Sequence, residues 1–325
     1  MRIGMNYPLE HLPLLEQREW IEEIERLGYD DLWMSEATQF DGVTAMALAS
    51  QWTEKLRLGC AAFPVQTRGP GLFAQTAASL SHAAPGRMVL GICASSQPIV
   101  EWWNSKTFER PYQYVKDTID LLGKAWSGEL ISHEWESFSL RYYKQRILPA
   151  ERPPVLVAGL REGMIRLGAR EADGVILNMC APEDVAKIVP IVREYGPDKE
   201  IALRVTMCPT DDYARGMAIA KNWAAGYVTV ESYREQQIWL GRGELIRETN
   251  ELWAGGDRKA AIQALPDEAV LGGWMVGTPD ECQERIGQYE EAGLDTLILS
   301  YLEDVCEPYS AIRDLAPQRA GRGSA

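Results

Sequence analysis

The chain has 325 residues, of which 46% are hydrophobic and 25% are charged, values that are ordinary for a globular protein. Its formal net charge of -14 disfavours nucleic acid as a partner, because binding nucleic acid needs a positive surface. No apolar run approaches the roughly 20 residues that span a bilayer, and the sequence MRIGMNYPLE is not a basic-then-apolar leader, so we expect neither a membrane partner nor export.

Cysteine and histidine are scattered rather than clustered. The six cysteines include no CxxC pair, and the three histidines, His11, His82 and His133, do not form a two-histidine zinc motif. Scattered single cysteines are typical of a reducing compartment rather than of a disulfide framework. We therefore predict a cytoplasmic protein with no metal site.

Apolar runs of strand length alternate with helical segments along the chain. Helices are predicted over 15–28, 41–53, 111–126 and 278–293, and another begins at Pro70. The polar, turn-rich stretch 127–140 is expected to form an excursion such as a hairpin. The predicted strands cover residues 2–7, 31–36, 55–64, 87–95, 153–159, 173–179, 200–209 and 295–301.

Strands that alternate with helices indicate parallel strands joined by helical crossovers. Eight such units favour an α/β fold closed into a (β/α)8 TIM barrel, and a doubly wound open sheet is the competing architecture. We predict one domain over 1–325, with insertions near 96–110, 127–150 and 211–277. The last insertion is mostly helical and lies between strands seven and eight. Functional residues are then expected at the carboxyl ends of the strands.

Six stretches, in this order, resemble the luciferase-like monooxygenase superfamily and, within it, the branch that uses coenzyme F420. They read LGYDDLWMSE, TEKLRLGCAAFPVQTRGP, APGRMVLGICASS, RPYQYVKDTIDLLGKAWSGE, PPVLVAGLREGMIRLGAREADGVILN and VGTPDECQERIGQYEEAGLDTLIL. Together they cover most of the chain apart from 211–277 and the tail. The resemblance implies a TIM barrel that binds a tricyclic cofactor at its carboxyl-terminal mouth, with the substrate above it.

The stretch GLREGM follows the fifth predicted strand, and the resemblance implies that it holds the cofactor phosphate. Its glycines permit close approach of the backbone and dihedral angles that other residues avoid. The free N–H groups at the start of the next helix point at an anion, and Arg161 adds a charge, with Arg166 as a more distant candidate. The alternative is an ordinary βα turn with a solvent-facing arginine. The candidates in this loop are Gly159, Leu160, Arg161, Glu162, Gly163 and Met164.

The resemblance places the rest of the cofactor site in three other stretches. In GCAAFP it implies a bulge with a non-prolyl cis peptide, at 60–61 or 61–62, beneath the central ring. In TRGP, Arg68 either faces an anionic cofactor or braces the next helix. In GICASS, small groups contact the cofactor, and nothing nearby in sequence activates Cys93 as a nucleophile. The candidates outside the phosphate loop are Cys60, Ala61, Ala62, Arg68, Cys93, Ala94, Ser95 and Asn178.

Two carboxylates are candidates for catalysis. Glu36 stands where many relatives have a histidine, and this departure removes the histidine that the resemblance associates with oxygen chemistry. Asp117 falls where some F420 enzymes have a glutamate. Each of them could act as a general acid or base. The alternative for Glu36 is a hydrogen-bonded structural carboxylate. The alternative for Asp117 is an exposed carboxylate on a helix surface.

The favoured function is that of an F420-dependent oxidoreductase, which transfers a hydride between reduced deazaflavin and a small organic substrate, preferably reducing a C=C or C=N bond. One alternative is an FMN-dependent luciferase-like monooxygenase, and a second is a cofactor-free binding barrel. The resemblance also implies a homodimer and a separate enzyme that reduces the cofactor.

Overall fold

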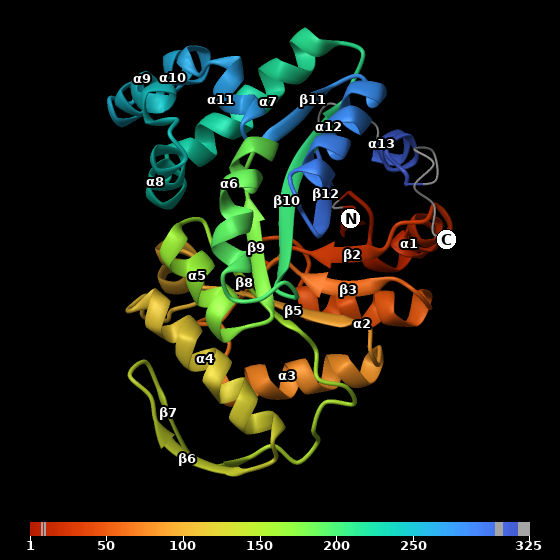
Figure 1. The fold of residues 1–325 in the computed structure, drawn as a ribbon, viewed down its shortest axis with the longest axis vertical. Helices are drawn as coiled ribbons and strands as arrows, with labels where there is room; N and C mark the ends of the chain where they lie inside the picture. Colours follow the sequence, from red (N-terminus) through yellow and green to blue (C-terminus); the bar gives the residue numbers. More distant parts are fainter. Residues whose placement is uncertain (8, 10, 303–307, 318–325) are drawn as a thin grey trace.

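Eight parallel strands close into a barrel in the computed structural model, which describes residues 1–7, 9, 11–302 and 308–317 (Figure 1). Strand β10 pairs with both β9 and β12, and this double pairing closes the ring, which confirms the TIM barrel over the open sheet. In order around the barrel the strands are β1 (Arg2–Tyr7), β2 (Asp31–Met34), β3 (Arg57–Cys60), β5 (Met88–Cys93), β8 (Val155–Ala158), β9 (Gly174–Asn178), β10 (Glu200–Pro209) and β12 (Thr296–Tyr301).

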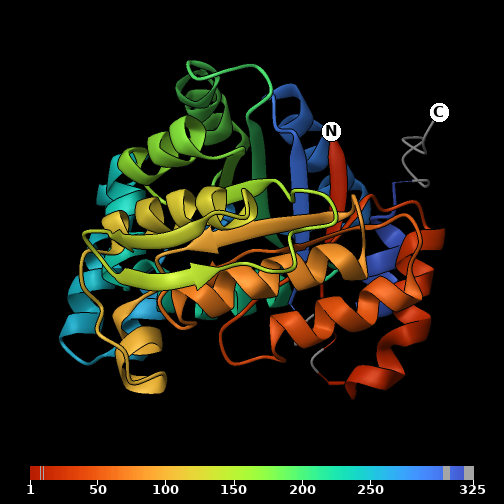
Figure 2. The same cartoon turned by 90° about the horizontal axis from the view of Figure 1, so that it is seen from below.

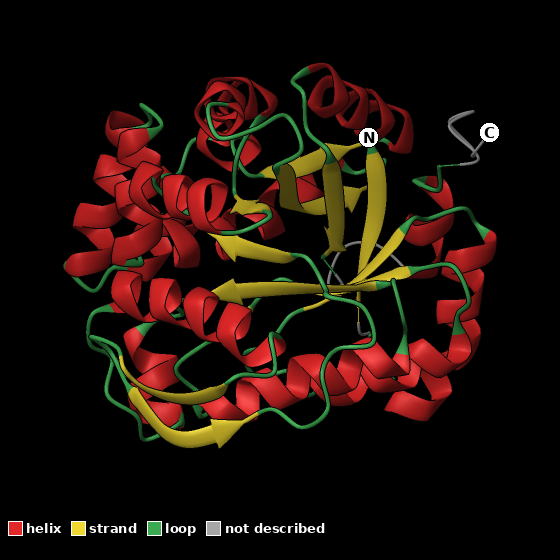
Figure 3. Ribbon diagram, turned by 60° about the horizontal axis from the view of Figure 1, so that its bottom comes forward, coloured by secondary structure: helices red, strands yellow, loops and turns green. Residues whose placement is uncertain are grey.

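Helices surround the strands on the outside of the barrel (Figure 3). The predicted cap of α12 is present, because the Thr278 hydroxyl accepts from the Glu281 N–H while the Glu281 carboxylate accepts from the Thr278 N–H. No helix in the described ranges is long and apolar enough to cross a membrane. The helices around the barrel are α1 (Arg18–Arg26), α2 (Gly42–Trp52), α3 (Pro70–Ala83), α4 (Pro111–Trp126), α5 (Glu162–Glu171), α6 (Pro182–Arg193), α12 (Pro279–Glu291) and α13 (Pro308–Asp314).

The expected excursion after α4 is a hairpin of β6 (Leu130–Glu134) and β7 (Ser139–Lys144). It lies outside the barrel, across α3 and α4 (Figure 2). The Tyr143 hydroxyl of β7 donates to the Gly71 carbonyl of α3 over 3.1 Å. The hairpin therefore covers two barrel helices rather than extending the barrel sheet.

The insertion between the last two barrel strands is helical, as predicted, and it also contains one strand. Strand β11 (Trp274–Gly277) pairs with the carboxyl half of β10, so β10 is long enough to serve both the barrel and the insertion. The apolar side chains of the insertion form a second hydrophobic cluster, which includes Trp274. The helices are α7 (Tyr213–Val228), α8 (Glu231–Trp239), α9 (Gly243–Ala254), α10 (Arg258–Ala264) and α11 (Asp267–Leu271).

The amino-terminal half of the barrel is filled by side chains. Trp33 is completely buried inside the barrel, and Gly59 on the neighbouring strand leaves room for its ring. At the first residues of the strands, the Arg57 guanidinium bridges Asp31 at 2.7 Å and Glu200 at 2.6 Å. A ligand can therefore reach the interior only from the carboxyl ends of the strands.

Replacing Gly59 by alanine tests this packing. A Cβ at Gly59 would lie 2.4 Å from the Trp33 ring, so we expect Gly59→Ala to lower the free energy of unfolding by about 1–3 kcal/mol or more. Gly123→Ala is the control, because a Cβ there has nothing within 4 Å and alanine favours the helix by up to about 1 kcal/mol. Chemical denaturation measures both variants, and equal stability of the two would contradict the account.

Candidate functional site

Above the buried interior, the next inward position of each barrel strand from β2 to β12 is small or polar. Side chains point inward at every second residue of a strand. Each of these positions therefore comes two residues after a residue that fills the buried interior, namely Trp33, Gly59, Gly91, Leu156, Ile176, Ala202 or Ile298. All of them except Ser300 are partly exposed, whereas the layer below is buried. We call this layer the mouth floor, and it consists of Ser35, Ala61, Cys93, Ala158, Asn178, Arg204 and Ser300.

The polar members of the mouth floor are hydrogen-bonded to their neighbours. The Ser35 hydroxyl donates to the Asn6 side-chain oxygen over 3.0 Å, and Arg204 Nη2 donates to the Ser300 hydroxyl over 3.0 Å. Such bonds fix rotamers, so the floor presents defined donors and acceptors to whatever rests on it.

Helix α8 of the insertion is joined to the edge of the mouth floor at Asn178. Gln236 Nε2 donates to the Asn178 carbonyl over 2.6 Å, and the Asn178 side-chain amide donates to the Tyr233 hydroxyl over 3.2 Å. Asn178, a predicted cofactor contact, thus also positions a phenol at the barrel mouth. Burial raises the pKa of Tyr233 to about 12, so its hydroxyl is protonated at neutral pH.

The predicted bulge after the third strand is present. The cis peptide joins Ala61 to Ala62, the second of the two expected registers, and β4 (Phe63–Pro64) resumes pairing with β5 beyond it. Both alanines are partly exposed. Cys60 is fully buried in the main core, backbone included, so the expectation that it contacts the cofactor is wrong for this state.

The turn after β5 agrees with a packing role for Cys93. Its thiol lies 3.7 Å from the Ala62 carbonyl, and burial raises its pKa to about 12, which leaves the thiol protonated and unreactive. Ala94 packs against the main core, and Ser95 has a left-handed backbone with φ of 66°. All three residues remain partly exposed beside the floor.

The loop GLREGM leads directly into α5, which begins at Glu162. In the described chain, no group accepts from the backbone N–H of Glu162 or Gly163, and no partner contacts the exposed Arg161 guanidinium. Leu160 is partly exposed, and Met164 packs against the main core. Unpaired N–H groups at a helix start and an unpaired cation are the donors that a phosphate requires.

Of the two glycines of this loop, only Gly159 is required for close packing, and neither has unusual dihedral angles. Neither has a positive φ, so the expectation of dihedral angles closed to other residues is wrong. A Cβ on Gly159 would lie 3.0 Å from the Ile165 nitrogen, whereas a Cβ on Gly163 would have nothing within 4 Å. Arg166 binds Glu162 at 2.7 Å and Glu194 at 2.6 Å, so its charge is already paired.

Glu36 and Arg68, two predicted site residues, bind each other. The Arg68 guanidinium donates to both carboxylate oxygens of Glu36 and also to Asp41 over 2.9 Å. It lies 5.1 Å from the centre of the Phe63 ring. Since Asp41 also caps α2, this ion pair joins β2, the loop before α3 and the start of α2. Both carboxylate oxygens of Glu36 are therefore occupied by Arg68.

Asp117 is buried beneath the hairpin. Its carboxylate accepts from Gln113 Nε2 at 2.7 Å, from the Ser137 N–H at 3.0 Å and from the Ser137 hydroxyl at 2.7 Å. The expectation that Asp117 is exposed on the helix is wrong. Its hydrogen bonds connect the β6–β7 turn to α4. The sequence could not show this, because Ser137 is twenty residues away in a turn.

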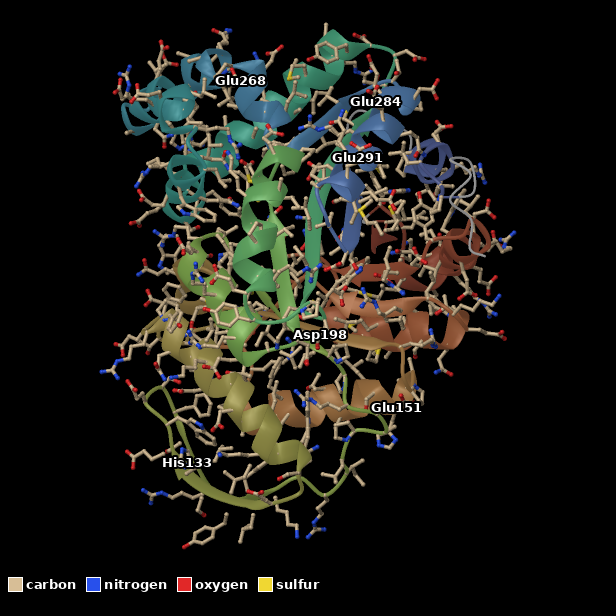
Figure 4. The ribbon with its side chains drawn as sticks, in the orientation of Figure 1. His133, Glu151, Asp198, Glu268, Glu284 and Glu291 are labelled. Carbon is tan, nitrogen blue, oxygen red and sulfur yellow. The ribbon has the colours of Figure 1, made fainter. Side chains whose placement is uncertain are left out.

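The three histidines are exposed, and none of them is a residue of the mouth floor. His133 lies on the hairpin (Figure 4), and the His82 ring is 2.9 Å from the Leu148 carbonyl. Among the described residues no group of three or more potential ligands could hold a metal ion.

Several residues of the site were not among the predicted candidates, and the two with the most chemistry are Arg204 and Tyr233. Arg204 lies within a strand rather than at its end. The alternation in EIALRVTMCP, which puts Glu200, Ala202 and Arg204 on one face, is a signal that could have found it. Tyr233 comes from the insertion, where no sequence signal placed it over the barrel.

Comparison with known proteins gives a family, relatives in sequence and solved structures of the same fold. The family model described as luciferase-like monooxygenase matches residues 1–296. An F420-dependent glucose-6-phosphate dehydrogenase of Beutenbergia cavernae is 25% identical over 323 residues, 92% of this chain and 90% of that protein. A coenzyme F420-dependent tetrahydromethanopterin reductase of Methanopyrus kandleri matches with a TM-score of 0.82 and 16% identity over 99% of both chains. The structure of an F420-dependent secondary alcohol dehydrogenase, in complex with an F420–acetone adduct, matches with a TM-score of 0.79 and 16% sequence identity over 97% of both chains.

Substituting Asp117 tests whether it anchors the hairpin. We expect Asp117→Asn to lower the free energy of unfolding by about 1–3 kcal/mol, because a buried acceptor of three hydrogen bonds loses its charge. A double-mutant cycle with Ser137→Ala should give a coupling energy of about 0.5–3 kcal/mol. Additive effects of the two substitutions in denaturant titrations would argue against the anchor.

Proposed function

The chain belongs to the luciferase-like monooxygenase family, and we propose that it is an F420-dependent oxidoreductase that transfers a hydride between reduced deazaflavin and a small organic substrate. The observation that carries the proposal is the unpaired donor set of the GLREGM loop, at the carboxyl end of a strand that borders the mouth floor. The names of the relatives support F420 over other cofactors.

The residues at the mouth fit such a cofactor. The N–H groups of Glu162 and Gly163, together with Arg161, would hold the phosphate, and the Glu162 carboxylate is held by Arg166. The exposed backbone around Ala61 and Ala62 would support the ring. Bound F420 supplies two-electron hydride chemistry, whereas the protein orients the reactants and excludes water.

We propose that neither predicted carboxylate donates the proton in the state described. Glu36 is bound on both oxygens by Arg68, and Asp117 is bound by the hairpin. The Glu36–Arg68 pair would brace the mouth beside Ala61, so that its role is to position rather than to react. The proton must then come from another group of the mouth or from water.

The preferred reaction is reduction of a C=C or C=N bond. In many relatives a histidine associated with oxygen chemistry stands where this chain has Glu36. Its replacement by Glu36 favours hydride transfer over oxygenation. We also propose, from the family resemblance, a cytoplasmic homodimer built from single-domain chains and supplied by a separate cofactor-reducing enzyme. An FMN-dependent monooxygenase is the alternative that the name of the family supports.

Titration with F420 and with FMN, followed by fluorescence quenching, tests the proposal. We expect F420 to bind at least about tenfold more tightly than FMN. The reverse preference would move the protein to the monooxygenase alternative. Binding of neither, with an intact far-ultraviolet circular dichroism spectrum, would revive the cofactor-free barrel.

The phosphate assignment is tested by a pair of arginine variants. Arg161→Met should weaken F420 binding about tenfold or more, because it removes a charge-assisted hydrogen bond. Arg170→Met is the control from the adjoining helix α5, since Arg170 is exposed and already paired with Glu171. Equal losses of F420 affinity in the two variants would contradict the assignment.

A further inference from the structure

We propose that Arg204 and Tyr233 form an oxyanion site for a substrate whose reducible bond is conjugated to a carbonyl group. Arg204 would bind the oxygen on which negative charge develops, and Tyr233 would supply the proton. This inference rests on the proposed function, because hydride delivery is assigned to the same mouth. It also names the substrate class, a conjugated ketone or a related carbonyl compound.

Arg204 is a half-buried cation without a counter-ion. Its Nη2 donates to Ser300, but its Nε is buried without an acceptor, and no ion pair of the described chain includes it. A buried charge without a partner is costly unless a ligand supplies the opposite charge.

Two other shielded arginines show the contrast. Arg57 lies between Asp31 and Glu200 at the closed end of the barrel, and Arg242 contacts Asp184 at 2.7 Å. Each of these cations has a carboxylate partner within the protein. Arg204, at the open end, therefore has the unmet charge that a ligand anion would satisfy.

Tyr233 has a hydroxyl proton that no described group accepts. The oxygen accepts from Asn178 over 3.2 Å, and the ring packs edge-on against Tyr227 with centroids 5.1 Å apart. Asn178 and Arg204 are direct partners in the β9–β10 register, which brings the hydroxyl toward the guanidinium. Burial raises the pKa of Tyr233 and the charge of Arg204 opposes this rise, so the two groups are within electrostatic reach.

The step balances with one hydride and one proton. The β-carbon of the conjugated substrate receives the hydride, the C=C electron pair moves into the conjugated system, and the carbonyl oxygen takes the negative charge beside Arg204. The O–H bond of Tyr233 breaks and the proton passes to that oxygen, which gives an enol that returns to the ketone. The tyrosinate recovers its proton from water. Reduced deazaflavin is the two-electron reductant.

Binding of an enolate tests the site without turnover. The probe is 1,3-cyclohexanedione, which is a planar enolate at neutral pH, and cyclohexanone is the neutral comparison. Calorimetric titration into protein saturated with oxidised F420 should show preference for the enolate. Arg204→Met should weaken enolate binding about tenfold or more, and Arg204→Lys should retain part of it. Tyr233→Phe should weaken it severalfold, and the control Arg170→Met, at an exposed arginine paired with Glu171, should not change it.

Three results would overturn the inference. The first is unchanged enolate affinity in Arg204→Met, the second is unchanged enolate affinity in Tyr233→Phe, and the third is preference for cyclohexanone. A different result would be that Arg204→Met weakens the binding of reduced F420 more than that of oxidised F420 and leaves enolate binding unchanged. Arg204 would then bind a negative charge of the reduced cofactor, and its assignment to the substrate would be wrong. Failure of F420 itself to bind the unaltered protein would refute the proposed function separately, and the titration of enolate into cofactor-free protein would still test Arg204.

Discussion

Closure of the barrel through the double pairing of β10 is the constraint on which the site depends. Once β10 pairs with β9 and β12, every second residue of each strand must point into a narrow interior. Trp33 and the Arg57 network fill the lower part, so the next inward layer becomes a floor that solvent reaches from one side. The same closure brings Arg204 beside Asn178, although the two residues are distant in sequence.

Some of the arginines near the barrel bind carboxylates, and two at its mouth do not. Arg57, Arg68 and Arg166 each bind carboxylates that come from other turns or other elements. Arg161 and Arg204 have no carboxylate partner among the described residues, and both lie at the carboxyl ends of the barrel strands or on the floor between them. In a chain with net charge -14, Arg161 and Arg204 are local positive charges at the mouth, and we propose that they receive the anionic groups of a ligand.

Much of the fold follows from local sequence patterns, because strand periodicity, helix caps and glycine positions act over a few residues. The barrel and the Thr278 cap were predicted in this way, whereas the cis peptide before Phe63 was implied by the family resemblance. Strand β11 was missed because WMVG is four residues long and gains its pairing only from the extended β10. The partners of Glu36 and Asp117 could not be predicted, since Arg68 and Ser137 reach them through tertiary contacts.

A crystal structure of the complex with F420 tests the central claim most directly. The account predicts the ring over the mouth floor against Ala61 and Ala62, and the phosphate within hydrogen-bond distance of the Glu162 and Gly163 N–H groups and of Arg161. Cofactor density away from the carboxyl ends of the strands, or a phosphate with no contact to α5, would contradict it. The pocket beside Trp126 and Pro149, at the far end of α4, is one such competing place.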